Sequence, residues 1–440
     1  MAAQNRNLKT TSLFNKQFIY SEISSRKKEI IEWLKSIVRF PSENRFPEGY
    51  EKGAQDFIEN ECKDLGLVTD VFLPTEVPGI ESDTSWLPGR DYSNGRKNVV
   101  AVWKGSGNGK SLLLSSHIDV APFEPDNWKI TRPYEPVEID GKLYGRGTVD
   151  MKGGMAAGFW AIKILKEMGF KPAGDIMFES VVDEEFAGGN GTLASRLKGY
   201  NADLAILAEP TMMDPCIACQ GAFLGEIVVR GVPGMPFHGN RIANPVDGAA
   251  RIIELFRDWE AYWDSINSHS LFKKPQGTLK LLLWGIDSNN GGETFTQMGS
   301  PQSVRLSWVI WSYPGTSEEF FYNKFRKFWS AYLKRDALLK CFNIEIKPTF
   351  HYVKPWETDQ DSRGVEKFKE VYKSFMDKKP VLKGASISCD MAIYGQQGGM
   401  PVIIIGPRGG NIHSSDEWVC MEDVFSLTGL FAALMIGFCS

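Results

Sequence analysis

The chain has 440 residues, of which 42% are hydrophobic and 24% are charged, and its formal net charge is −4. This length exceeds one ordinary hydrophobic core, so we expect two domains. The composition has no basic excess of the kind that nucleic-acid binding requires. The longest apolar stretch, residues 429–439, is shorter than the ~20 residues of a membrane span and predicts a buried final helix. We therefore expect neither a nucleic acid nor a membrane as a partner.

The seven cysteines are an odd number in a long chain, which is typical of a reducing compartment rather than of a disulfide framework. Residues 1–25 are polar and mixed and lack the apolar core of a signal peptide. The expected location is therefore cytoplasmic. Cys216 and Cys219 form a C-x-x-C, but without a second pair this spacing is a weak metal signal.

The first informative elements are two strands, predicted at residues 98–103 and from residue 112 onward. The segment between them, GSGNGKS, ends like a phosphate-binding loop, but Lys104 stands where the first glycine belongs and a strand follows. We interpret it as a hairpin turn. The second strand runs into His117 and Asp119, which share one face, so the histidine can bind a metal while the aspartate orients its ring. Taken alone, Asp119 fits a structural ion pair equally well.

Carboxylates recur at the ends of the next predicted elements. Asp150 lies ahead of a glycine pair and an apolar periodic stretch, so it caps the approach to a helix. A buried strand then runs straight into Glu184 and Glu185, which point in different directions and can take different roles. The apolar run within residues 202–210 closes with Glu209. Acidic side chains thus follow several strands of one predicted sheet.

The pattern changes between Glu209 and His413. The order there is strand, helix, strand, strand, helix, strand, which is the split ferredoxin-like pattern of four antiparallel strands with two helices on one face. The predicted ranges are 226–232, 246–263, 278–286, 304–311, 317–333 and 343–350. We therefore predict two domains, a larger one formed by residues 1–222 and 353–440, and a small one formed by residues 223–352 inserted into it.

The last informative segment, residues 401–419, carries His413 after a Val-Ile-Ile-Ile strand. An open, mostly parallel sheet gathers functional groups outside the carboxyl ends of its strands, so residues far apart in sequence meet there. Two histidines, three carboxylates and open positions for water suit zinc, cobalt or manganese. The sequence predicts an α/β catalytic domain with helices on both faces of a mostly parallel sheet. At its edge we expect two divalent metal ions per subunit, with zinc favoured over cobalt and manganese.

These five segments together resemble the family of dinuclear metallohydrolases that includes acetylornithine deacetylase, succinyl-diaminopimelate desuccinylase, aminoacylase-1 and glutamate carboxypeptidase. The resemblance covers most of the chain and depends on the order of the segments as well as on their residues. It implies that His117 and Glu209 bind one ion and that Glu185 and His413 bind the second. Asp150 would bridge both ions.

The same resemblance implies a mechanism and a partner. Glu184 would be the general base for attack of a metal-bound hydroxide on an amide carbonyl, and Asp119 the partner of the first histidine. The peptide bond between Asp150 and Met151 is expected to be cis. In family members the inserted domain, here residues 223–352, is a lid, and a histidine of this lid domain reaches the active site of the partner subunit. His238 matches that histidine. The resemblance therefore implies a homodimer formed through the lid domain and a role for His238 in holding the oxyanion. A surface-loop histidine is the alternative.

The substrate is less determined by the sequence. Family members often carry an arginine in the lid that can anchor a substrate carboxylate, but Trp311 takes that place here. With several further tryptophans in the insertion, an aromatic substrate is one interpretation and packing of the lid core is the favoured one. Arg408 could supply the missing clamp or point to solvent. Asp390 matches a family position, and we expect it to support the metal ligands without binding a metal ion itself.

The favoured function is hydrolytic removal of an acyl group from an N-acylated amino acid or a similar small amide. One alternative is a metallo-exopeptidase that acts on a dipeptide or a C-terminal residue. Another is a hydrolytic deaminase or deformylase of an aromatic substrate, which the same metals allow. A metal-binding scaffold without catalysis is disfavoured, because the general base and every ligand are present.

Overall fold

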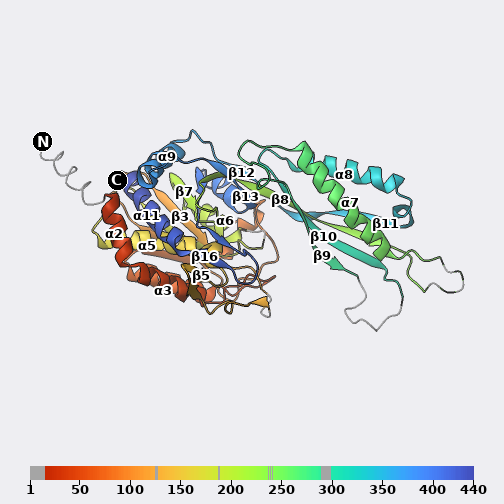
Figure 1. The fold of residues 1–440 in the computed structure, drawn as a ribbon, viewed down its shortest axis with the longest axis horizontal. Coiled ribbons are helices and arrows are strands. Elements are labelled where there is room, and N and C mark those ends of the chain that lie inside the picture. The colour runs from red at the N-terminus through yellow and green to blue at the C-terminus, as the bar shows by residue number, and fades with distance from the viewer. Residues whose placement is uncertain are drawn as a thin grey trace. The chain divides into compact units, whose positions relative to one another are not determined.

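The computed structural model describes residues 15–123, 127–186, 189–235, 237, 239, 241–288 and 299–440. These residues form two compact units (Figure 1). The first contains Met1–Ala218, Glu357–Lys383 and Cys389–Ser440, and the second contains Cys219–Trp356 and Gly384–Ser388. The predicted boundaries assigned the short segment Gly384–Ser388 to the catalytic domain. It joins the second unit instead, because it belongs to strand β13 (Lys383–Ser388), which pairs with β8 (Cys216–Arg230).

The first unit is built on a sheet whose central strands are parallel. In spatial order the strands are β1 (Val68–Phe72), β2 (Asn98–Trp103), β6 (Ile176–Val181), β3 (Leu112–His117), β7 (Leu204–Leu207) and β14 (Val402–Ile404). The last four run parallel, while β1 and β2 are antiparallel to their neighbours. The expected hairpin between β2 and β3 is wrong. Strand β6 lies between them, because its long apolar run is buried only in the middle of the sheet.

Helices cover both faces of this sheet, as alternation along the strands shows. Leu114 and Phe178 face α5 (Gly153–Glu167), where an added Cβ at Gly158 would lie 3.5 Å from the leucine. The next residue on each strand points the other way, and there Glu179 accepts a hydrogen bond from Arg196 of α6 (Asn190–Leu197). The predicted doubly covered α/β sheet is therefore confirmed.

The remaining helices of the first unit complete these layers. Helices α3 and α11 both pack against α5 although they lie at opposite ends of the chain (Figure 1). In the part of the chain that the structure describes, α11 is the one helix long and apolar enough to cross a membrane, and most of it is buried inside the protein. The helices are α2 (Lys16–Ser25), α3 (Lys27–Val38), α4 (Lys52–Asp64), α9 (Arg363–Met376), α10 (Met391–Gln396) and α11 (Met421–Phe438).

A second, small antiparallel sheet joins two segments that lie far apart in the sequence. Its strand order is β15 (Gly409–Gly410), β16 (Trp418–Cys420), β5 (Lys142–Tyr144) and β4 (Val137–Ile139). The pairing of β16 with β5 brings the segment around His413 to the segment that precedes Asp150. Two candidate ligands more than 250 residues apart are thus tied together by backbone hydrogen bonds.

The second unit has the predicted ferredoxin-like order. Strands β8, β9 (Leu281–Asp287), β10 (Ser303–Ser312) and β11 (Asn343–Val353) alternate with helices α7 (Pro245–Ile266) and α8 (Glu318–Arg335). The strands pair antiparallel in the spatial order β11, β8, β10, β9. Each predicted element is present, but β8 begins ten residues earlier than position 226, at Cys216, because its first part pairs with β14 of the first unit's sheet.

Tryptophans fill the core of this unit. Trp259, Trp263, Trp308 and Trp329 are fully buried and contact one another or the phenylalanines between them. Gly225 is required opposite Trp308, since a Cβ there would lie 2.1 Å from the indole ring. The favoured interpretation, that the lid tryptophans pack its core, is confirmed for Trp259, Trp263 and Trp308, but it is wrong for Trp284, which is 61% exposed.

Candidate metal centre

The proposed ligands lie where the central strands end. His117 is the last residue of β3, Glu184 and Glu185 follow β6, and Glu209 follows β7. Because these strands are parallel neighbours, their carboxyl ends share one edge of the sheet. His413 reaches the same place from the loop between β15 and β16. The structure therefore brings the histidines and carboxylates of all five segments together.

Asp150 lies between the two histidines. One oxygen of its carboxylate, Oδ1, lies 3.1 Å from His117 Nε2, and the other, Oδ2, lies 3.3 Å from His413 Nε2. His117 Nε2 also lies 3.6 Å from Glu209 Oε1, while His413 Nε2 lies 2.8 Å from Glu185 Oε2. The carboxylate thus presents one oxygen to each of two pairs, His117 with Glu209 and His413 with Glu185. This is the arrangement expected for an aspartate that bridges two ions.

The donor atoms are close enough to share metal ions. Ligand atoms of His117, Glu184 and Glu209 lie within 4.8 Å of one another, and so do those of His117, Asp150 and Glu185. Among the described residues, no lysine or arginine forms an ion pair with any of these carboxylates. Four converging carboxylates with only histidines as basic partners are costly in a buried site unless cations neutralise them. Imidazole nitrogen with carboxylate oxygen suits zinc, cobalt or manganese.

The electrostatics of the metal-free site show the same need for positive charge. Burial, together with the charge of Glu209, raises the pKa of Glu184 well above its ordinary value, although His117 opposes this. Burial likewise raises the pKa of Glu209 well above its ordinary value. The charge of Glu185 raises the pKa of His413 to about 11, so without metal this ring holds a proton. These shifts all favour added positive charge at the cluster, which two divalent ions would supply.

Asp119 supports His117 in a different way from that expected. The ring nitrogen Nδ1 donates to the main-chain carbonyl of Asp119 at 2.9 Å, while the nearest carboxylate oxygen, Oδ1, is 3.6 Å away and makes no hydrogen bond. The bond to the carbonyl leaves Nε2 free to bind a metal ion. The other carboxylate oxygen accepts from the backbone N–H of Glu185 at 2.9 Å and from Asn44 at 2.7 Å. Asp119 therefore connects two ligand-bearing loops.

A buried network that the sequence did not suggest supports the Glu184–Glu185 turn. Asp183, at a positive φ of 72°, accepts hydrogen bonds from Arg90, Arg96, Tyr92 and Asn44. Asn44 also bonds Asp119, so the network reaches both sides of the site. These side chains are fully or almost fully buried. A charge buried at this depth is retained only when it is paired and hydrogen-bonded, which fixes the turn that carries the two glutamates.

Glu417 holds the loop that carries Asp150. Its carboxylate accepts from Arg146 Nη1 at 2.8 Å and from the backbone N–H groups of Gly147, Val149 and Asp150 at 2.9, 3.0 and 3.3 Å. The peptide bond that follows, Asp150–Met151, is cis, as expected. Glu417 stands four residues after His413, and this position in the segment SSDEW was the one available signal. An acidic residue a few positions after a candidate metal-binding histidine can therefore support the site even when it does not follow a strand.

The other site residues named from the sequence have different outcomes. His238 lies outside the described residues. Asp390 is buried behind the site, where it accepts from Thr192, and burial raises its pKa to about 6. Arg408 does not act as a clamp in this structure, because it donates from Nε and Nη2 to both oxygens of Asp423 at 2.6 and 2.8 Å.

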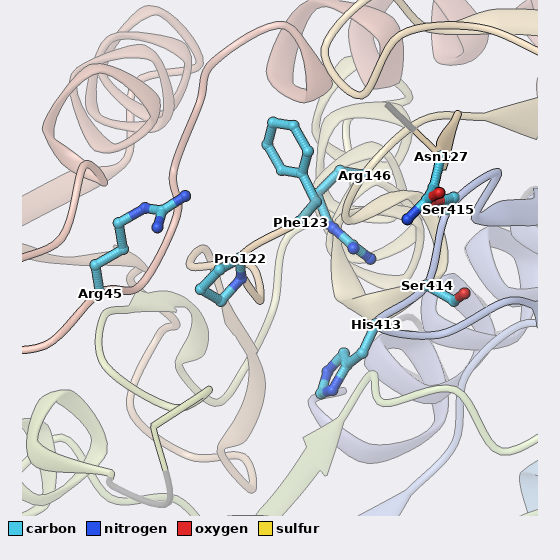
Figure 2. A pocket seen from close by; sticks show the side chains of 8 residues that line it. All are labelled: Arg45, Pro122, Phe123, Asn127, Arg146, His413, Ser414 and Ser415. Atoms are coloured by element: carbon cyan, nitrogen blue, oxygen red, sulfur yellow. The ribbon is translucent and has the colours of Figure 1, made fainter. Parts of the chain in front are cut away.

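A cavity of about 510 Å³ adjoins the exposed side of the metal centre at His413 (Figure 2). Arg45 stands on one side of it, and Arg146, Asn127, Ser414 and Ser415 stand on the other, with Pro122 and Phe123 between them. The imidazole of His413 is half exposed and contributes to the wall. The volume of the cavity is within the range typical of small-molecule sites.

The fold and the site together define the class of protein. The model of Peptidase family M20/M25/M40 matches residues 113–436, and the chain belongs to this family. It is therefore a dinuclear metal-dependent hydrolase of the amidohydrolase and peptidase type.

Comparison with individual relatives narrows the range of activities within this class only in part. N-formyl-4-amino-5-aminomethyl-2-methylpyrimidine deformylase of Bacillus subtilis is 26% identical over 457 residues, which cover 96% of this chain and 98% of that protein. Succinyl-diaminopimelate desuccinylase of Nautilia profundicola is 24% identical over 368 residues, which cover 81% and 93% of the two chains. Human carnosine dipeptidase 1 superposes with a TM-score of 0.71 at 16% identity, covering 97% of this chain and all of that one. The last likeness shows a shared fold.

Proposed function

We propose that this protein hydrolyses the amide C–N bond of a small N-acyl compound and releases the free amine. The carboxylate of Asp150, with one oxygen toward each of two histidine–glutamate pairs, is the observation that carries the proposal. The deformylase and the desuccinylase described above are both named for removing an acyl group, formyl or succinyl, from nitrogen. This supports acyl removal over cleavage of a dipeptide.

Five residues would hold the ions. His117 and Glu209 would bind one, His413 and Glu185 the other, and Asp150 would bridge them, with zinc favoured from the mixture of imidazole and carboxylate donors. The bound ions supply Lewis acidity, which lowers the pKa of water and polarises the amide carbonyl. Two divalent ions bring four positive charges against three ligand carboxylates, so the filled centre carries a net charge of about +1 and favours an anionic nucleophile.

Glu184 would move the proton. Its carboxylate is buried beside His117 and Glu209, and burial raises its pKa above the ordinary value, which favours a role in proton transfer. We assign to it the acceptance of a proton from the attacking water and its delivery to the leaving nitrogen. His117 is kept in the correct tautomer by the carbonyl of Asp119, and the hydrogen bond from Glu185 N–H to the Asp119 carboxylate orients the adjacent loop.

The test is a substrate panel on cobalt- or zinc-loaded protein, with amine release followed by mass spectrometry. The panel contains N-formyl, N-acetyl and N-succinyl amines, dipeptides and aromatic formamides, and Glu184→Ala protein is the control. Turnover of N-acyl compounds in preference to dipeptides, lost in the control, is the expected result. Cleavage of dipeptides alone would replace the proposal with an exopeptidase.

We also propose a homodimer formed through the lid unit. Strand β9 stands at the edge of its sheet, and Leu282, Trp284 and Ile286 are exposed along one face, the tryptophan by 61%. A long apolar edge strand normally pairs or is covered. Light scattering during gel filtration should give twice the chain mass for the wild type and a monomer for Trp284→Lys. A monomeric wild type would remove this proposal, and with it the proposed contribution of His238 across the interface.

A cytoplasmic location remains a proposal too. No disulfide joins the seven cysteines, all of which lie among the described residues, and this suits a reducing compartment. Fractionation of cells with an antibody to the protein would test it, and recovery outside the cytoplasmic fraction would contradict it.

A further inference from the structure

Phe46 is an exposed aromatic side chain that borders the metal centre. It is 58% exposed, and a single exposed apolar residue needs no functional explanation by itself. The surroundings of Phe46 are less ordinary. It directly follows Arg45, which lines the cavity at His413 (Figure 2), and its ring stacks on that of Phe186, the residue after the proposed ligand Glu185. The exposed ring is therefore connected to the site from two sides.

Phe46 and Phe186 form a stacked pair of rings. Their centroids are 5.3 Å apart and their planes are inclined by 26°, which is within the ordinary range of about 4.5–7 Å for aromatic pairs. Phe186 is partly buried, whereas more than half of the Phe46 side chain stays in contact with solvent. The stack thus ends in an open ring, to which a further ring could be added.

A buried arginine fixes this pair in place. The guanidinium carbon of Arg90 lies 5.6 Å from the ring centroid of Phe46 and 4.9 Å from that of Phe186. Its Nη1 donates to the main-chain carbonyl of Arg45 at 3.0 Å, and its Nε donates to Asp183 at 2.8 Å. The Arg90 side chain is itself inaccessible to solvent. One cation therefore holds both the segment that carries the exposed ring and the turn that carries the proposed ligands, and a preorganised surface of this kind loses little entropy when it binds a ligand.

We propose that the Phe46–Phe186 pair is a platform on which an aromatic ring of the substrate stacks while its amide lies at the metal centre. The inference rests on the proposed function and names the substrate class within it: N-acyl amines that carry an aryl group. Aromatic pairs gain more than the burial of their area alone, so a planar ring is favoured over an aliphatic group of the same size. Because Phe186 is joined directly to Glu185, a short linker between the ring and the amide nitrogen matches the position of the platform.

The kinetic test compares N-formylbenzylamine with N-formylcyclohexylmethylamine, or the corresponding pair for whichever acyl group the panel selects. The two compounds have the same ring size and linker and differ in aromaticity. We expect the ratio of kcat/KM for the aryl compound to that for the cyclohexyl compound to fall about three- to tenfold in Phe46→Leu, mainly through KM. Phe46→Tyr should keep the wild-type ratio because it retains the ring. An unchanged ratio in Phe46→Leu would overturn the platform.

The matched control is Phe18→Leu, the same substitution at another exposed phenylalanine, which lies on α2. It should keep the wild-type ratio, and an equal fall in this control would overturn the assignment to Phe46. Light scattering during gel filtration addresses a different occupant of the exposed ring. A change of mass in Phe46→Leu with an unchanged ratio would assign the ring to a contact between proteins and overturn the platform.

A binding measurement separates this inference from the proposed function. Zinc-loaded Glu184→Ala protein, with and without Phe46→Leu, is titrated calorimetrically with the same two compounds. Tighter binding of the aryl compound that Phe46→Leu removes would support the platform even if the wild type turns over no N-acyl compound, a result that would sink only the proposed function. Equal affinity for the aryl and the cyclohexyl compound sinks the platform whatever the activity.

Discussion

Besides the aliphatic side chains that both units bury, the two units of this protein bury different kinds of side chain. The first unit buries ion pairs around the metal centre, among them Arg90 with Asp183, Arg96 with Glu51 and Arg146 with Glu417. The second unit buries tryptophan and phenylalanine rings, and its ion pairs are at least partly exposed among the described residues. Buried ion pairs add little net stability, whereas they fix geometry. We conclude that the buried ion pairs of the first unit serve to hold ligands in place and that the buried aromatic rings of the second unit serve to hold that unit together.

The largest expected effect concerns the proton-transfer group in the first unit. Glu184→Gln should lower kcat by about 10²–10⁴-fold, because the amide cannot accept a proton from water. Metal content measured by atomic absorption should stay at two ions, since Glu184 is not among the proposed ligands. Loss of an ion in this variant would mean that Glu184 is a metal ligand. The experiment tests this directly, because the carboxylate of Glu184 lies close to the ligand atoms of His117 and Glu209.

Removing the buried charge of Asp183 should affect both stability and the metal centre. Asp183→Asn leaves Arg90 and Arg96 without their shared carboxylate, and breaking such a buried pair costs about 3–5 kcal/mol in the free energy of unfolding. Because the network orients the Glu184–Glu185 turn, zinc affinity should also fall, by about 10–100-fold. Urea unfolding and calorimetric zinc titration measure the two effects. A stability loss with unchanged zinc affinity would contradict the positioning role.

A lid substitution of similar energetic size should leave the metal centre intact. Trp308→Ala removes a fully buried indole and should cost about 3–5 kcal/mol of unfolding free energy. The same urea and zinc measurements apply, and zinc affinity should match the wild type. Loss of zinc binding here would break the division of roles between the two units.

The charge state of His413 gives a pH-dependent prediction for protein stripped of metal. Glu185 raises the folded-state pKa from 6.5 to about 11, so the stabilisation is fully present below pH 6.5 and is lost as the pH rises toward 11. The urea midpoint of metal-free protein should therefore fall across this window more steeply than that of His413→Gln. Parallel curves for the two proteins would show that His413 does not titrate in this range. Loading with zinc should flatten the wild-type curve, because a ligated histidine is already deprotonated.

The smallest effect is expected at the exposed pair that borders the site. Arg408→Gln removes its bond to Asp423, and since the arginine is largely exposed the loss should be at most about 1 kcal/mol. KM for the best substrate should not change. A marked rise in KM would restore Arg408 as a substrate contact.

The sequence was sufficient for the parts of the site that follow a regular pattern. His117 and Glu209 each close an apolar strand, and a polar residue at the end of such a run can be recognised without coordinates. The lid was predictable for the same reason, because its strands and helices carry clear periodicity. Sequence also favoured core packing for the lid tryptophans, and Trp259 and Trp308 are fully buried.

The supports of the site could not be predicted in this way. Asn44 lies in an irregular segment and contacts Asp119 and Asp183 across 75 and 139 residues of sequence. Such contacts depend on how loops fold in space, and no periodicity marks them. The place of strand β13 depends likewise on a long-range pairing with β8. The expected hairpin between β2 and β3 failed because local turn chemistry does not reveal a third strand that comes between.

The measurement that tests the central claim most directly is a calorimetric zinc titration of metal-free wild type, His413→Ala and His117→Ala. The geometry of Asp150 between two histidine–glutamate pairs predicts two ions per chain for the wild type and one for His413→Ala, with the remaining ion held by His117, Glu209 and Asp150. His117→Ala should lose the opposite ion. Two ions of unchanged affinity in both variants, or a single ion in the wild type, would contradict the two-metal centre.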